Sequence, residues 1–220
     1  MRRILLIGQS GGIGAALKEA FEAQGDHVVG LSRSAQGFDF AVPDQVERIL
    51  GELEPGFDGI FIASGVLTAQ ANGPEKSLKE IDASELAANF AVNCVGPALV
   101  MKHASQLLKR RAPTFCVALS ARVGSIGDNR AGGWYAYRAS KVALNQIVHT
   151  AAIELARTHK GNICVAMHPG TVETSFTANY KAAPKVPAET AAENLLAVLE
   201  GLTPADSGGF YDWAGKRVPW

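Results

Sequence analysis

The sequence is poor in cysteine, in net charge and in long apolar runs, and each shortage excludes a class of protein. Its three cysteines stand apart (Cys94, Cys116 and Cys164), so we expect buried free thiols and neither a disulfide framework nor a thiolate metal site. Basic and acidic residues are equal at 21 each, which leaves no field that would attract nucleic acid or an acidic membrane. No apolar run approaches the ~20 residues of a membrane-spanning helix.

Clustered histidines and internal repeats are missing too, and we expect no leader segment. The five histidines form no cluster, so no metal site is expected. Two arginines near the N-terminus precede only four apolar residues before the first glycine, too few for a signal peptide. We therefore expect a cytoplasmic protein that starts at Met1. Without repeats or linkers, residues 1–220 should form a single domain.

Short apolar runs alternate with stretches of helical periodicity along the chain. Because parallel strands need helix-length crossovers, this alternation predicts an α/β fold, a doubly wound, mostly parallel sheet with helices on both faces. We expect about seven strands in the Rossmann-type order 3-2-1-4-5-6-7. The predicted strands lie near 3–7, 27–31, 38–40, 57–63, 114–120, 162–167 and 209–212. The predicted helices lie near 12–24, 43–53, 82–109, 134–158 and 188–200.

A glycine-rich turn follows the first predicted strand and opens the first predicted helix. Its sequence is Gly8-Gln-Ser-Gly-Gly-Ile-Gly14. Glycines let the backbone approach a pyrophosphate, and the unpaired N–H groups of a helix N-terminus point at it. The alternative is a tight turn that needs glycine for its shape. The strand–turn–helix context favours a dinucleotide site, formed by Gly8, Ser10, Gly11, Gly12, Ile13 and Gly14.

The end of the second predicted strand discriminates between the two nicotinamide cofactors. An acidic residue there would bind the ribose diol of NAD and repel the 2′-phosphate of NADP. This chain has Ser32 and Arg33 instead, with no carboxylate. A guanidinium suits phosphate, so we expect NADP(H) in preference to NAD(H). The alternative is that Arg33 is a solvated loop residue.

Tyr137 and Lys141 lie four residues apart in a predicted helix and therefore share a face. A nearby ammonium favours phenolate, which lowers the tyrosine pKa from its ordinary value of about 10. Such a tyrosine can give a proton to a carbonyl or take one from an alcohol. Alone this spacing is a weak signal. Tyr135 competes less well, since Ala139 stands four residues after it.

The remaining polar and glycine residues collect after the predicted strands. In an open parallel sheet, ligands bind beyond the carboxyl ends of the strands, so these segments should line one cleft. The stretch 171–187 lacks a clear pattern and is expected to form a loop over it. The segments are Ser32–Arg33, Asp39, Ala63-Ser64-Gly65, Ser120 and His168–Thr174.

Together these segments resemble the short-chain dehydrogenase/reductase family over essentially the whole chain. The motifs that carry the resemblance are Gly-Gly-Ile-Gly14, Ala63-Ser-Gly65, Asn93 in Val-Asn-Cys-Val-Gly96, Tyr137-x-x-x-Lys141 and Pro169-Gly-Thr-Val-Glu-Thr174. Within the family, the sequences around 122–137 and 210–220 are similar to the C-factor branch and to the carbonyl reductase called sniffer.

The resemblance implies a role for each motif. Tyr137 would be the general acid or base, Lys141 would lower its pKa and hold the nicotinamide ribose, and Asn93 would kink a helix and hold a water near the lysine. Asp39 would accept a hydrogen bond from the adenine amino group. The residues that would hold the nicotinamide amide are Pro169, Gly170, Thr171, Val172 and Thr174. Helices 82–109 and 134–158 would form the contact of a homodimer or homotetramer.

One position departs from the family pattern. The family's active-site serine is the second of a Ser-Ser pair, and Ala121 stands there in this chain. The hydroxyl at Ser120 is displaced by one residue, and successive side chains of a strand point to opposite faces. A twist at the strand end would allow Ser120 to cover the position, which is the expectation we favour. Ser125 is one alternative, and a slow enzyme without a covering hydroxyl is the other.

These features predict an NADP(H)-dependent oxidoreductase that reduces an aldehyde or ketone, or oxidises the corresponding alcohol. A sugar-nucleotide epimerase or dehydratase is less expected, because those relatives carry a sizeable second domain. A nucleotide-binding signalling protein with weak or no catalysis is the other alternative. The stretches 124–136 and 171–187 would shape the substrate pocket. Candidates for its apolar wall are Trp134, Phe176 and Tyr180, and packing in the core or in a lid is the alternative for them.

Overall fold

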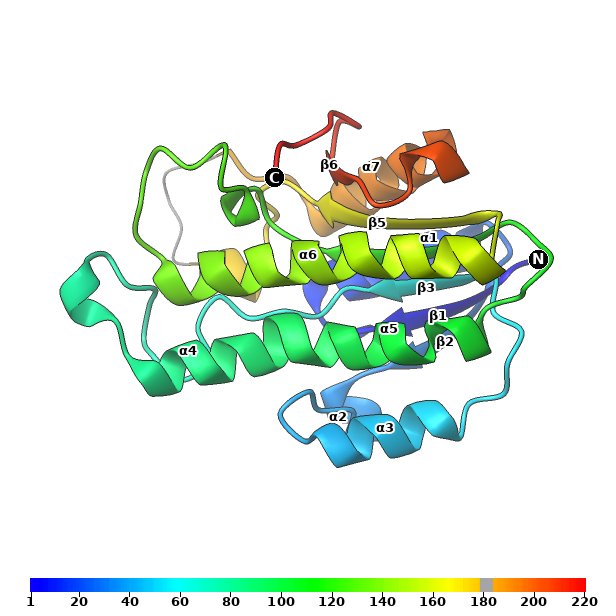
Figure 1. Cartoon of the computed structure of the whole chain (residues 1–220), viewed down its shortest axis with the longest axis horizontal. Helices are drawn as coiled ribbons and strands as arrows, with labels where there is room; N and C mark the ends of the chain where they lie inside the picture. The colour runs from blue at the N-terminus through cyan, green and yellow to red at the C-terminus, as the bar shows by residue number, and fades with distance from the viewer. Residues whose placement is uncertain (179–183) are drawn as a thin grey trace.

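The computed structural model describes residues 1–178 and 184–220, and it shows a parallel sheet between two groups of helices (Figure 1). The strands are β1 Arg3–Ile7, β2 His27–Leu31, β3 Gly59–Ile62, β4 Thr114–Leu119, β5 Asn162–His168 and β6 Phe210–Asp212. The α-helices are α1 Gly12–Ala23, α2 Arg33–Gln36, α3 Pro43–Gly51, α4 Ala83–Phe90, α5 Gly96–Leu107, α6 Tyr135–Thr158 and α7 Ala188–Gly201. Short helical segments are η1 Leu78–Glu80, η2 Ala91–Val95, η3 Arg122–Gly124, η4 Ser175–Thr177 and η5 Pro204–Asp206.

The six strands of the described sheet are ordered β2-β1-β3-β4-β5-β6, and every neighbouring pair is parallel. All carboxyl ends therefore lie at one edge, on the left in Figure 1, where the long connections also gather. This confirms the predicted doubly wound α/β class.

The predicted strand near 38–40 is wrong, and the described sheet has six strands where about seven were expected. The segment Phe38-Asp-Phe40 alternates apolar and polar residues like a strand. It instead forms a turn, in which the Ala41 N–H donates to Asp39 Oδ1 at 2.9 Å. Both phenylalanines are buried, with ring centroids 5.5 Å apart. The alternation thus reflects two core side chains around one polar turn residue.

Each strand contributes side chains to two separate cores. Leu5 and Ile7 face the helices α3, α5 and α6, whereas Ile4 and Leu6 face α1 and α7. Because both faces are covered, the strands are apolar at almost every position rather than at every second one. The three cysteines are buried free thiols, as predicted. Among the described residues, no helix is long and apolar enough to cross a membrane.

The helical run predicted over 82–109 contains one widened turn. Between α4 and α5, residues Ala91–Val95 form a π-helical turn. Pro97 explains its place, because proline has no N–H to donate to the carbonyl of Asn93 and its ring clashes with that carbonyl. The kink that the resemblance implied at Asn93 is therefore present.

Candidate active site

The glycine-rich turn closes tightly over the end of β1 and leaves no room for a side chain at Gly8, Gly12 or Gly14. Gly8 has φ 89°. A Cβ on Gly14 would lie 2.0 Å from the Gly8 carbonyl oxygen, and one on Gly12 would lie 2.5 Å from Thr174 Cγ2. Helix α1 begins behind Gly11 without a side-chain cap, so its first N–H groups are open to a ligand. This bare helix N-terminus fits the pyrophosphate of a dinucleotide.

The end of β2 presents a cation and no carboxylate. Ser32 is buried, and its N–H donates to Gln36 Oε1 at 2.9 Å. Arg33 begins α2 and is exposed. None of the ion pairs among the described residues includes it. Ser10 of the glycine-rich turn is exposed as well. The arrangement suits a phosphate group beyond the end of β2.

Tyr137 and Lys141 are both buried on the first turns of α6. Tyr137 is 7% exposed and Lys141 3% exposed, and the ammonium lies 5.9 Å from the centre of the phenol ring. Lys141 Nζ donates to the Leu119 carbonyl oxygen at 2.9 Å, which ties the lysine to the carboxyl end of β4. Burial lowers the pKa of Lys141 to about 8, an effect that Cys94 partly opposes. Lys141 is thus held in position by this hydrogen bond, and most of it carries its positive charge at pH 7.

The tyrosine ring is enclosed by two other aromatic rings. The centre of the Trp134 ring lies 6.3 Å from that of Tyr137, and Phe176 from η4 lies at 5.9 Å. Two members of the expected apolar wall are therefore at the site. The third, Tyr180, lies outside the described residues.

The segment after β3 passes between the glycine-rich turn and the lysine. A Cβ on Gly65 would lie 3.1 Å from Asn93 Oδ1 and 3.3 Å from Lys141 Nζ. Ser64 Oγ lies against Gly8, at 2.6 Å from where a Cβ would stand. The Ala63 N–H donates to the Ile7 carbonyl, which continues the sheet pairing by one residue. The structure thus brings Ala63-Ser64-Gly65 together with the expected cofactor and catalytic residues.

Asn93 is fully buried in the π-helical turn and holds the segment after β3 in place. Its Oδ1 accepts from the Val66 N–H at 2.9 Å, and its Nδ2 donates to the Val66 carbonyl at 2.8 Å. Nδ2 also approaches Asn89 Oδ1 at 2.6 Å and Ser140 Oγ at 3.2 Å. The Asn93 carboxamide therefore makes its hydrogen bonds to protein groups around Lys141. Its expected contact with a water stays a prediction.

The structure does not support Ser120 as the substitute for the missing family hydroxyl. The side chain of Ser120 points toward α6, and its hydroxyl donates to Asn145 Oδ1 at 2.7 Å. Leu119 faces the core on the other side of the sheet, so strand alternation continues through Ser120. Ser125 is 1% exposed, and its oxygen accepts from the Asp128 N–H at 3.1 Å. Ala121 is left at the family position without a hydroxyl.

The segment after β5 closes the cleft from the other side. Gly170 has φ 82°, and Val172 is buried. Thr174 precedes η4 and packs against Gly12, so the end of this segment meets the glycine-rich turn. Burial, with Arg122 nearby, lowers the pKa of His168 to about 4 against the opposing effect of Asp212, so this histidine is neutral at pH 7.

Several residues of this region were not identified from the sequence. Asn145 accepts from Ser120 and donates to the Gly124 carbonyl at 3.0 Å. It lies four residues after Lys141, a spacing that places it on the same helix face. Glu75 and Arg138 hold the start of α6 by hydrogen bonds to backbone groups. No motif marks either of them, because their partners are backbone atoms, which any residue at those positions would supply.

Comparisons with known proteins agree with this geometry. A family profile described as Enoyl-(Acyl carrier protein) reductase matches residues 30–209. The chain is 34% identical over 144 residues to C-signal of Myxococcus xanthus, covering 66% of this chain and 84% of that protein. It is 28% identical over 236 residues to 1-hydroxy-2-glutathionyl-2-methyl-3-butene dehydrogenase of Rhodococcus sp. (strain AD45), covering 100% of both. A structure of a putative short-chain dehydrogenase/reductase from Burkholderia multivorans with bound NADP aligns over 100% of both chains, with TM-score 0.81 and 23% identity.

Proposed function

The chain belongs to the short-chain dehydrogenase/reductase family of oxidoreductases, and we propose that it reduces an aldehyde or ketone with NADPH, or oxidises the corresponding alcohol. The observation that carries the proposal is the buried Tyr137–Lys141 pair, with the ammonium 5.9 Å from the phenol ring and bonded to the end of β4. A buried phenol next to a fixed cation suits proton transfer to a carbonyl oxygen.

The cofactor site is assigned to the segments that follow β1, β2, β3 and β5. Bound there, the nicotinamide would supply the hydride. The glycine-rich turn would bind the pyrophosphate through its open N–H groups. Asp39 would accept from the adenine amino group, and residues 169–174 would hold the nicotinamide amide. The assigned residues are Gly8, Ser10, Gly11, Gly12, Ile13, Gly14, Ser32, Arg33, Asp39, Ala63, Ser64, Gly65, Pro169, Gly170, Thr171, Val172 and Thr174.

The preference for NADP(H) rests on Arg33. This exposed guanidinium begins α2 directly after β2, and Ser32 before it carries no charge. A planar, permanently charged fork binds a phosphate in a bidentate manner. The absence of a carboxylate at this strand end removes the repulsion that selects NAD.

Tyr137, Lys141 and Asn93 would each have a separate role in the proton transfer to or from the substrate oxygen. Tyr137 would donate its proton to the substrate oxygen in reduction and accept it in oxidation. Lys141 would stabilise the phenolate and hold the nicotinamide ribose. Asn93 would fix the backbone beside the lysine through Val66. Because Ala121 carries no hydroxyl and Ser120 is bonded to Asn145, Tyr137 is the one hydroxyl donor that we assign to the substrate oxygen.

The exchange Tyr137→Phe tests the proposal, since it keeps the ring and removes the proton. It should lower kcat for carbonyl reduction by about 10²–10⁴-fold and leave NADPH binding, measured by fluorescence titration, unchanged. Tyr135→Phe is the matched control, two residues earlier on the same helix, and should retain activity. An unchanged rate in Tyr137→Phe would remove the acid role.

A signalling protein with weak catalysis is the second candidate, favoured by Ala121 at the family's hydroxyl position and by the similarity to C-signal. Both candidates require nucleotide binding, so turnover separates them. Tight NADPH binding without oxidation of NADPH across a panel of aldehydes and ketones would favour this second candidate.

We also propose that the helices of residues 82–109 and 134–158 form the contact of a homodimer or homotetramer. Each carries exposed apolar side chains, among them Val95 at 43% and Ile153 at 53% exposure. Exposed apolar side chains on neighbouring helices fit a subunit contact. A monomer in multi-angle light scattering would contradict this.

A further inference from the structure

The residues just before α6 form a left-handed turn. Gly132, Gly133 and Trp134 have φ of 65°, 65° and 57°. Trp134 is the only residue other than glycine with positive φ in the described part of the chain. A left-handed conformation costs an ordinary residue about 1–2 kcal/mol, and such strain persists only where the surroundings enforce it. The enforcement comes from the backbone carbonyl and carboxylate of Glu75 and from the side chain of Arg138.

Glu75 holds the turn from the connection after β3. Its carbonyl oxygen accepts from the Trp134 N–H at 2.5 Å, and its carboxylate accepts from the Ala136 N–H at 3.2 Å and 3.4 Å. The residue is 6% exposed. A buried carboxylate at the N-terminus of a long helix interacts favourably with the helix dipole. One residue therefore fixes both the turn and the start of α6.

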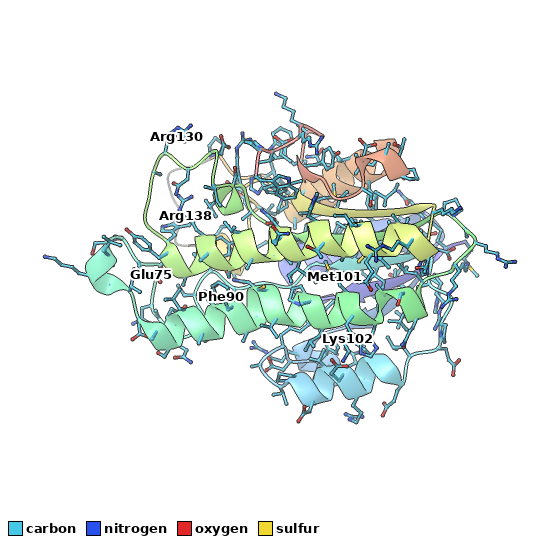
Figure 2. All side chains as sticks on the ribbon, in the orientation of Figure 1. Glu75, Phe90, Met101, Lys102, Arg130 and Arg138 are labelled. Atoms are coloured by element: carbon cyan, nitrogen blue, oxygen red, sulfur yellow. The ribbon has the colours of Figure 1, made fainter. Side chains whose placement is uncertain are left out.

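Arg138 holds the same turn from within α6. Its Nε donates to the Gly133 carbonyl at 2.9 Å and one Nη to the Gly132 carbonyl at 3.2 Å. Its other Nη donates to the Val123 carbonyl at 3.2 Å, in the loop after β4. The planar guanidinium of Arg138 thus donates to three carbonyl oxygens, a geometry that the ammonium of a lysine does not reproduce. Figure 2 shows Glu75 and Arg138 near the N-terminal end of α6, with Arg130 farther out on the preceding loop.

Trp134 of this turn is near both the proposed acid and a cavity. The cavity measures about 470 Å³, and Tyr137 is not among its lining residues. Trp134 does line it, and the centre of its ring lies 6.3 Å from the centre of the Tyr137 ring. A volume of this size holds a small organic group. The cavity is lined by Lys76, Val123, Ala131, Gly132, Gly133, Trp134 and Arg138.

We propose that Trp134 is the specificity-determining side chain of this site: its indole separates the cavity from Tyr137 and limits the size of the carbonyl compound that reaches the acid. Glu75 and Arg138 are positioning residues that act through the left-handed turn. The inference rests on the proposed reductase function. It identifies the substrates of the native protein as small carbonyl compounds. It also predicts that removing the indole gives a larger substrate access to the cavity.

The test compares two aldehydes of different size, propanal and 2-naphthaldehyde. Trp134→Gly removes the indole and keeps a residue that tolerates positive φ. The ratio of kcat/KM for 2-naphthaldehyde to that for propanal should rise roughly 10-fold or more, the range that one pocket contact supplies. An unchanged ratio in a variant that still reduces propanal would overturn the inference while the proposed function stood. A wild-type protein without turnover of any carbonyl would overturn both.

Four further variants test the positioning residues. Arg138→Lys keeps the charge and removes the fork, so the ratio should move in the same direction. Arg130→Lys is the matched control, because Arg130 is exposed and, among the described residues, its guanidinium donates to the neighbouring Asn129 carbonyl alone. Glu75→Ala removes the acceptor of the Ala136 N–H and should act like Arg138→Lys, and Glu75→Gln, which keeps an acceptor for that N–H, should restore the wild-type ratio.

A second measurement reports on the turn itself. With Trp213 and Trp220 replaced by Phe, Trp134 is the only tryptophan left of three. Its fluorescence anisotropy should fall in Arg138→Lys and stay unchanged in Arg130→Lys. Equal anisotropy and an equal substrate ratio in these two variants would overturn the positioning role.

Discussion

Replacing Lys141 by Met keeps the length of the side chain, removes the ammonium, and should change how the free energy of unfolding depends on pH. Lys141 is 3% exposed, and burial lowers its pKa from 10.5 to about 8. At about 1.4 kcal/mol for each pKa unit, this difference corresponds to roughly 3 kcal/mol. The figure is the destabilisation of the folded state by the buried charge.

The sign of the pH dependence follows from the two protonation states. Below about pH 8 both the folded and the unfolded chain carry the charge, so the folded state bears the full destabilisation. Between about 8 and 10.5 the unfolded chain still binds the proton that the folded chain has released. The stability of the wild-type protein should therefore rise with pH in this window, relative to the variant, by up to roughly 3 kcal/mol.

Urea denaturation at several pH values between 7 and 10 measures this effect. At a single pH, the loss of the hydrogen bond from Lys141 to the Leu119 carbonyl opposes the gain from removing the charge, so the slope is the informative quantity. Lys102→Met is the control, since the Lys102 side chain is 64% exposed and pairs with Glu47 on α3 (Figure 2). A constant difference between wild type and Lys141→Met across this range would refute the argument.

Three other outcomes are expected. Arg33→Ala should raise KM for NADPH much more than KM for NADH in steady-state assays, and equal effects would remove the NADP assignment. Ala121→Ser restores a hydroxyl donor at the family position and should raise kcat by up to roughly 10²-fold, the factor that one such donor supplies. An unchanged kcat in stopped-flow measurements would mean that another group already covers the position. Gly14→Ala should lower the melting temperature without cofactor, because its Cβ would lie 2.0 Å from the Gly8 carbonyl, whereas Gly11→Ala, with its nearest atom at 3.5 Å, should melt like the wild type.

Much of the fold was predictable because the strands are buried on both faces. Runs such as Arg3–Ile7 and His27–Leu31 are short, apolar and bounded by turn residues, and the structure confirms both at their predicted bounds. Phe38–Phe40 was misjudged because a three-residue alternation also describes two core anchors around a turn. Local pattern does not reveal whether a neighbouring strand is available for pairing.

The candidate site was predictable where a motif is contiguous. The glycine-rich turn and the Tyr137–Lys141 spacing each follow from a local backbone rule. The role expected for Ser120 depended on a twist at the strand end, whereas the observed alternation continues and its hydroxyl donates to Asn145. Glu75 and Arg138 escaped notice because they bind main-chain groups, and such partners leave no trace in residue identity.

The π-helical turn around Asn93 gives the chain room to lose one residue there without rotating the helices on either side. A turn of this kind holds one residue more than an ordinary helical turn. Deleting one of residues 91–95 would let the turn close into regular geometry, and α4 and α5 would keep nearly the same faces toward α6. The Asn93 carboxamide would lose the outward position from which it bonds to the Val66 backbone. A single-residue deletion in this segment should therefore disturb the backbone beside Lys141 more than it disturbs the packing of α4 and α5.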